Sequence, residues 1–139
     1  MSNSLNHPGV FKKAGAEIQS VLDLDQLMDE PDLSKLHYLQ NIILETIRLY
    51  PTDPLTVPHL SSDDCMGQRA CLGEGMAQRV LGLTLGLLIQ CFHWKRVDDK
   101  EVDMRDGKGL TMPKVVSLEA MCKARPIFNK AFSKVVAAV

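Results

Sequence analysis

Apolar residues recur every three or four positions along two segments in the first half of this 139-residue chain. Such spacing places apolar side chains on one face of an α-helix. The pattern predicts one amphipathic helix that begins near Pro8 and a second that covers Leu36 to Leu49 and is ended by Pro51. The first stripe is Val10, Ala14, Ile18 and either Val21 or Leu22, and the second is Leu36, Leu39, Ile43, Ile47 and Tyr50.

A third helix is predicted by the apolar run "VLGLTLGLLI" at residues 80–89. It should extend over about 73–90, and its apolar part is too short for a membrane span, which indicates a buried helix. Pro31 is expected to break the acidic connector between the first two helices. Three prolines within residues 51–59 predict an extended or turned segment.

The C-terminal part of the sequence changes to short alternating segments. "EVDM" at 101–104 and "GLTMP" at 109–113 flank "RDGKG", which predicts a β-hairpin. We therefore expect a mainly α-helical fold with a small C-terminal β-hairpin or sheet.

Composition narrows the function classes. A net charge of −1 gives no electrostatic basis for nucleic-acid binding. The N-terminus has no charged region followed by an apolar one, so neither a secretory signal nor a membrane anchor is expected in this chain.

The four cysteines contain no CxxC pair and are expected to be reduced thiols. A zinc site formed by Cys65, Cys71, Cys91 and His93 would match no tight zinc spacing.

The candidate chemistry lies in "MGQRACLGEG" at residues 66–75. Cys71 stands just before a predicted helix, where free N–H groups and the helix dipole favour an anionic thiolate. Gly67 and Gly73 allow a tight turn and a close backbone approach to a flat ligand. The alternative is an inert buried thiol, because free cysteine often behaves as a small hydrophobic residue.

Glu45 and Arg48 in "ETIR" are three residues apart and so neighbours on the second helix. Taken alone, this pair is read as a solvated surface ion pair that contributes about 0.3 kcal/mol. E-x-x-R alone is a common string. The combination found here is less common: E-x-x-R, then a proline-rich segment, then R-x-C-x-G before an apolar helix.

In this combination the chain resembles the C-terminal part of a plant microsomal cytochrome P-450, a haem-thiolate monooxygenase. Residues 1–14 resemble the J helix of that family, 38–65 the K helix and the following segment, and 67–94 the cysteine loop and L helix. Residues 101–126 resemble the C-terminal sheet of the subgroup of isoflavone and flavonoid hydroxylases.

The resemblance implies a role for each matching residue. Cys71 corresponds to the axial ligand of haem iron, and Arg69 and His59 to the propionate contacts. Glu45 and Arg48 correspond to the K-helix pair, whose role is structural. The alternatives to the propionate contacts are that Arg69 is solvated and that His59 is a loop histidine without a ligand. The implied cofactor-binding set is His59, Gly67, Arg69 and Gly73, with Cys71 as the metal ligand.

The same resemblance implies NADPH- and O2-dependent hydroxylation of a small aromatic, flavonoid-like substrate, with an NADPH-cytochrome reductase as partner. Full-length members belong to the endoplasmic reticulum membrane. A chain without a signal or anchor is expected in the cytoplasm.

The chain also departs from the family pattern. Only "HLSSDDC" separates "VP" from the cysteine loop, where family members continue for several tens of residues, including the meander. Asp64 stands where a phenylalanine normally shields the sulfur, and a carboxylate there would raise the pKa of the thiol. We also expect this sequence to contain neither the I helix nor most of the substrate pocket. The alternative is therefore a catalytically dead, truncated protein that binds haem weakly or not at all.

We expect a single partial domain with exposed apolar surface where family members have further packing partners. Its predicted parts are a J- and K-helix part at 1–59, an irregular deletion junction at 60–68, the cysteine loop and L helix at 69–95, and a C-terminal β part and tail at 96–139.

Overall fold

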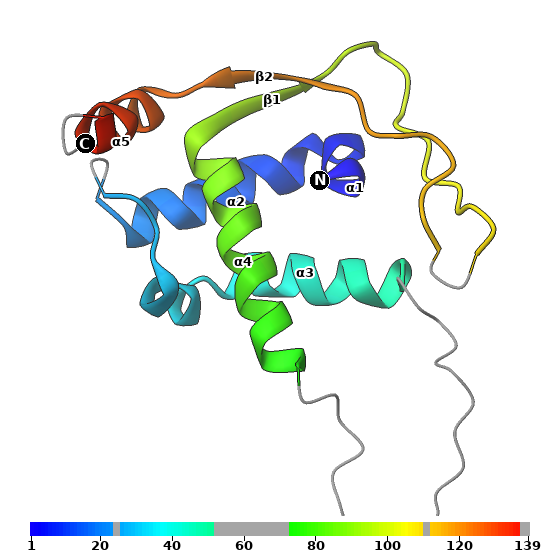
Figure 1. The fold of residues 1–139 in the computed structure, drawn as a ribbon, viewed down its shortest axis with the longest axis horizontal. Helices are drawn as coiled ribbons and strands as arrows, with labels where there is room; N and C mark the ends of the chain where they lie inside the picture. The colour runs from blue at the N-terminus through cyan, green and yellow to red at the C-terminus, as the bar shows by residue number, and fades with distance from the viewer. Residues whose placement is uncertain (24–25, 52–72, 110–111, 137–139) are drawn as a thin grey trace, which may run out of the picture.

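The computed structural model describes residues 1–23, 26–51, 73–109 and 112–136. The described part is mainly helical and carries a two-stranded antiparallel sheet (Figure 1). Its elements are α1 (Ser2–Asn6), α2 (Pro8–Val21), the 3-10 helix η1 (Glu30–Lys35), α3 (His37–Leu49), α4 (Glu74–Cys91), β1 (Phe92–Arg96), β2 (Ala120–Ala124) and α5 (Pro126–Val136). The three predicted helices and the fold class are confirmed.

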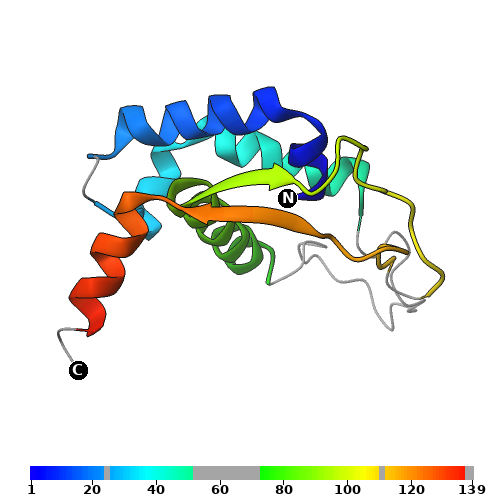
Figure 2. The same cartoon turned by 90° about the horizontal axis from the view of Figure 1, so that it is seen from above.

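The hydrophobic core forms where α4 crosses α2 and α3, which lie behind it in Figure 1 and on one side of it in Figure 2. Ala14, Ile18 and Leu22 of the first predicted stripe are buried there, as are Leu36 and Leu39 of the second. Burial of these side chains is the main favourable contribution to the fold. The two stripes therefore identify most of the core that α2 and α3 contribute.

A carboxylate on α2 caps the start of α3. The Glu17 side chain accepts hydrogen bonds from the backbone N–H groups of Tyr38 (2.7 Å) and Leu39 (3.0 Å). The first N–H groups of a helix have no partner within the helix, and an acceptor there stabilises the helix. Glu17 thus fixes α3 against α2 as well as completing its first turn.

Two glycines of α4 allow its close approach to neighbouring elements. A Cβ at Gly82 would lie 3.0 Å from a methyl of Leu33 in η1. A Cβ at Gly86 would lie 2.7 Å from the sulfur of Met28 and 3.1 Å from a methyl of Leu39. Real Cβ atoms rarely come this close to other atoms, so the packing of α4 depends on these two positions.

The connector between α2 and α3 is more regular than Pro31 predicted. Pro31 lies in the first turn of η1, where its missing N–H is tolerated. Asp29 caps this helix, since its carboxylate accepts from the N–H of Glu30 (2.7 Å) and its own N–H donates to Asp32 (3.2 Å). Pro31 therefore begins a short 3-10 helix within the connector that separates α2 from α3.

The sheet joins segments that the hairpin prediction did not pair. β1 follows α4 directly and pairs with β2, with Trp94 opposite Cys122. The chain reverses where the hairpin was predicted, with an antiparallel bridge between Asp106 and Lys114 and a hydrogen bond from the N–H of Val115 to the carbonyl of Arg105 (3.0 Å). The described residues of 101–104 and 109–113 are not strands, and residues 110–111 lie outside the described residues. The pairing that forms is long-range, and local alternation carries no information about such partners.

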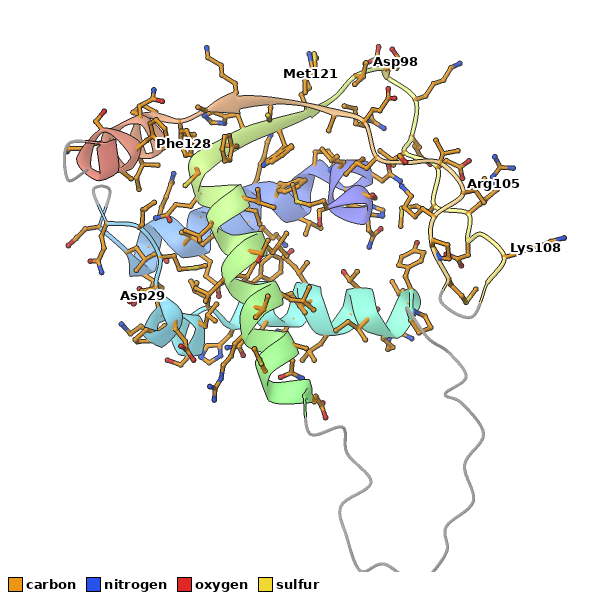
Figure 3. The ribbon with its side chains drawn as sticks, viewed as in Figure 1. Asp29, Asp98, Arg105, Lys108, Met121 and Phe128 are labelled. Atoms are coloured by element: carbon orange, nitrogen blue, oxygen red, sulfur yellow. The ribbon has the colours of Figure 1, made fainter. Side chains whose placement is uncertain are left out.

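Helix α5 was not predicted from the sequence. Phe128 of this helix packs on Phe92 of β1, with ring centroids 4.9 Å apart, and the label in Figure 3 locates it beside the sheet. Phe128 also stacks with Phe132 at 5.9 Å. Aromatic pairs in such tilted or stacked arrangements are favourable, so this row of rings attaches α5 to the sheet.

Candidate functional site

The end of α3 carries the predicted pair of charged residues. Arg48 donates to both carboxylate oxygens of Glu45, from Nε at 2.7 Å and from Nη2 at 2.6 Å. These hydrogen bonds hold the pKa of the Glu45 carboxyl below its ordinary value and raise the pKa of Arg48. More than half of each side chain is exposed, so water screens the pair and it contributes little to stability by itself.

The start of α4 is the described part of the cysteine loop. Gly73 is the residue before its first turn, and its carbonyl accepts from the N–H of Ala77 at 2.9 Å. Its backbone angles, φ −86° and ψ −3°, are open to any residue, so a tight turn does not require glycine at this position. A close approach of a ligand to Gly73 stays a prediction. The other members of the predicted set, His59, Gly67, Arg69 and Cys71, lie outside the described residues.

A cavity of about 310 Å³ lies where the first half of α4 meets α3 and η1. Large apolar side chains on both helices near it are exposed, with Met76 the most exposed at 73%. Folded domains usually cover surfaces of this kind, so the expectation of exposed apolar surface is confirmed. The exposed large apolar residues of α3 and α4 are Leu44, Ile47, Leu49, Met76, Val80 and Leu81.

The described ranges offer no metal centre of their own. Within them, no three His, Cys, Asp or Glu side chains come together as a cation site. Of the cysteines there, Cys91 is buried and Cys122 is exposed, and neither forms a disulfide.

Sequence reasoning missed a second cavity, between α2, α4 and α5, to which Gln90 and Arg125 contribute. Neither residue belongs to a motif, and α5 itself was not predicted. No local signal in the sequence could have brought these two side chains together.

Comparison with known proteins identifies the family to which this chain belongs. The sequence profile described as Cytochrome P-450 matches this chain in two segments, residues 4–66 and 65–119. The chain belongs to the cytochrome P-450 family. The two matched segments cover most of the chain and include α2, α3 and α4, so the three helices that build the core are those of this family.

Named plant relatives match most of the chain. Cytochrome P-450 81D1 of Arabidopsis thaliana is 41% identical over 96% of the chain and 37% of the relative. Isoflavone 3'-hydroxylase of Medicago truncatula is also 41% identical, over 93% of the chain and 36% of the relative. Isoflavone 2'-hydroxylase of Glycyrrhiza echinata is 38% identical over 96% and 37%. The chain therefore spans little more than a third of the length of these curated relatives.

None of the helices in the described ranges has the length and apolar character needed to cross a membrane.

Proposed function

We propose that this chain carries the thiolate side of a cytochrome P-450 haem site, with Cys71 as the iron ligand. The observation that carries the proposal is that the family profile matches the sequence on both flanks of the cysteine loop. The motif residues of that loop stand in the order and spacing of the family. In this proposal Arg69 and His59 hold the haem propionates, while Gly67 and Gly73 admit the flat ring.

The chemistry of the donor set suits haem. Cys71 precedes α4 by three positions, and Gly73, the residue before that helix, has no side chain that could cap its first N–H groups. The N–H donors at a helix start and the positive end of the helix dipole favour a thiolate over a thiol. When bound, haem supplies an iron whose thiolate ligand favours cleavage of the O–O bond. The guanidinium of Arg69 provides charge-assisted hydrogen bonds to a carboxylate.

The Glu45–Arg48 pair has a structural role in this proposal. Its bidentate geometry holds the last turn of α3 in one arrangement, and α3 packs against α4, the helix that follows Cys71. In this proposal the pair is a positioning element and takes no part in the haem chemistry.

The relatives named as isoflavone hydroxylases support a small aromatic, flavonoid-like substrate for the whole protein. We propose NADPH- and O2-dependent hydroxylation, with electrons delivered by an NADPH-cytochrome reductase at the endoplasmic reticulum membrane. This assignment applies to a protein that includes the remaining two thirds of the family length.

A specific observation favours a second candidate, a catalytically dead form with an internal deletion. The alignment with the Arabidopsis relative has 184 positions against 139 residues in this chain, so at least 45 positions of the relative have no counterpart. The two profile segments meet at residues 65–66, within the junction proposed at 60–68. In this form Asp64 beside the loop disfavours the thiolate, and haem binds weakly or not at all.

Haem titration followed by the carbon monoxide difference spectrum of the reduced protein tests both candidates. A thiolate signature in the wild-type chain and in Cys65→Ala, lost in Cys71→Ala, supports the haem site. A signature that survives Cys71→Ala refutes the ligand assignment. Absence of the signature in every variant supports the dead form. Where the signature is present, turnover of an isoflavone with reductase and NADPH separates an active enzyme from an inactive haem protein.

A further inference from the structure

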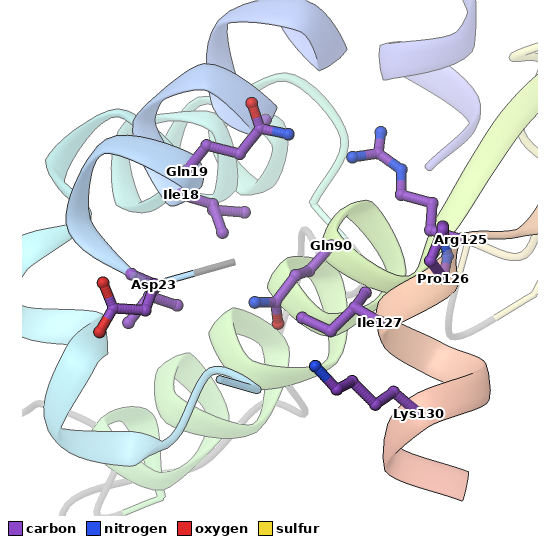
Figure 4. Close-up of a pocket in the computed structure, with 10 residues that line it drawn as sticks. Ile18, Gln19, Asp23, Gln90, Arg125, Pro126, Ile127 and Lys130 are labelled. Carbon is purple, nitrogen blue, oxygen red and sulfur yellow. The ribbon is translucent and has the colours of Figure 1, made fainter. Parts of the chain in front are cut away.

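A second cavity, of about 370 Å³, opens beside the hydrophobic core (Figure 4). It lies between the end of α2, the end of α4 and the start of α5. Its volume falls at the lower end of the range found for small-molecule sites in proteins. Gly73, the described member of the predicted haem-site set, does not line it.

Most of the wall is apolar. Ile18 and Leu22 of α2 are buried core residues, and Ile127 of α5 extends into the space shown in Figure 4. The polar atoms of Gln90 are already used, because Oε1 accepts from the N–H of Met28 (3.0 Å) and Nε2 donates to the carbonyl of Gln26 (2.8 Å). A ligand would therefore meet an apolar wall with little neutral hydrogen-bonding capacity left on Gln90.

The exception is Arg125, the residue before α5. Its Nε is buried and has no hydrogen-bond partner in the described part of the chain. None of the ion pairs found among the described residues involves Arg125. A buried donor on a charged group is unfavourable until an acceptor reaches it. The Arg125 guanidinium lines the cavity without a carboxylate partner among the described residues, and it therefore favours an anionic ligand.

The charged residues of the described lining are Arg125, Lys130 of α5 and Asp23. Figure 4 shows the amino group of Lys130 directed toward the side of Gln90, and Asp23 at the opposite end of the space. Arg125 is therefore the residue that an anionic group would contact.

We propose that this cavity binds a small amphipathic carboxylate, with its anionic group on the Arg125 guanidinium and its apolar body against Ile18, Leu22 and Ile127. The chemistry is that of a short fatty acid or an arylalkanoic acid. A ligand of about ten non-hydrogen atoms fits the cavity, and a Kd of about 1 mM or tighter is expected.

Titration of the full 139-residue chain with octanoate, followed by amide chemical shifts, tests the proposal. Saturable shifts are expected at Ile18, Leu22, Gln90 and Ile127. Octan-1-ol, which lacks the charge, should bind at least about 10-fold more weakly. Parallel titration with 3-phenylpropanoate distinguishes the two kinds of apolar body, since the tighter ligand identifies which one the cavity prefers.

Arg125→Gln keeps hydrogen-bonding capacity but removes the charge, and it should weaken octanoate binding about 10-fold or more. Arg105→Gln is the matched control, because Arg105 is an exposed arginine that pairs with Asp103 and does not line the cavity; it should bind as the wild type does. Equal affinity of wild type and Arg125→Gln, or equal binding of octanoate and octan-1-ol, would overturn the proposal.

Ile127→Glu provides a test that retains Arg125. An acidic residue is favourable in the first turn of a helix, so the variant should fold. Its carboxylate would occupy the anion position within the cavity and abolish octanoate binding. Binding as in the wild type, or shifts confined to the exposed residues of α3 and α4, would refute the site.

Discussion

The packing of α4 can be tested with one methyl group. Gly86→Ala introduces a Cβ that would lie 2.7 Å from the sulfur of Met28 and 3.1 Å from a methyl of Leu39. Both neighbours are in the core, where Met28 is 4% exposed and Leu39 fully buried. The variant must therefore displace packed side chains.

Two effects of opposite sign determine the result. Replacing glycine by alanine within a helix stabilises it by about 1 kcal/mol, whereas overpacking a core costs about 1–3 kcal/mol. Because the Met28 side chain is flexible and yields in part, we expect a net loss of about 1 kcal/mol. Gly15→Ala in α2 is the matched control. Its nearest neighbour is a methyl of Ile89 at 3.9 Å, so it should gain about 0.5–1 kcal/mol.

Urea denaturation followed by far-UV circular dichroism and by the single tryptophan, Trp94, measures both changes. Met28→Ala should remove most of the steric overlap with the new Cβ. Gly86→Ala should therefore be neutral or stabilising when it is combined with Met28→Ala. If Gly86→Ala stabilises the wild-type chain as much as Gly15→Ala does, the proposed close approach of α4 to its neighbours is refuted.

Further predictions concern single side chains. Gln90→Ala leaves a buried N–H unpaired and should lower the free energy of unfolding by about 2 kcal/mol in urea denaturation, unlike an exposed glutamine of α4. Cys91 is buried and burial raises the pKa of its thiol, so mass spectrometry should find it alkylated at least about 100-fold more slowly than the exposed Cys122. Arg105 lowers the pKa of Asp103 from 3.8 to about 2, so the contribution of this carboxylate to stability is present above pH 3.8 and lost as pH falls toward 2. An NMR titration of Arg105→Gln should move the Asp103 midpoint back toward 3.8.

The sequence predicted the helices well because their information is local. Stripes at spacings of three and four identified α2 and α3, and the apolar run at 80–89 identified α4. The second stripe also shows the limit of the method, because Leu39 is fully buried whereas Ile47 is exposed. Periodicity places residues on one face of a helix, but only the neighbouring elements decide how much of that face is covered.

Elements that depend on distant partners were missed. β1 pairs with β2 across more than twenty intervening residues, and α5 is attached through Phe92 and Phe128. The Glu17 cap on α3 likewise joins residues 21 and 22 positions apart. No window of local sequence contains both members of such contacts, so their prediction requires the tertiary fold.

The two segments that match the family profile form one core even though the alignment omits at least 45 positions of a relative. Helix α4 comes from the second segment, and its glycine face packs on Met28 and Leu39 of the first. The Glu45–Arg48 pair also keeps its bidentate geometry in the first segment. The missing positions therefore do not remove the contacts that hold the described helices together. Denaturation of Gly86→Ala therefore measures helix packing, whereas haem titration of Cys71→Ala tests the proposed haem site, and the two experiments are independent.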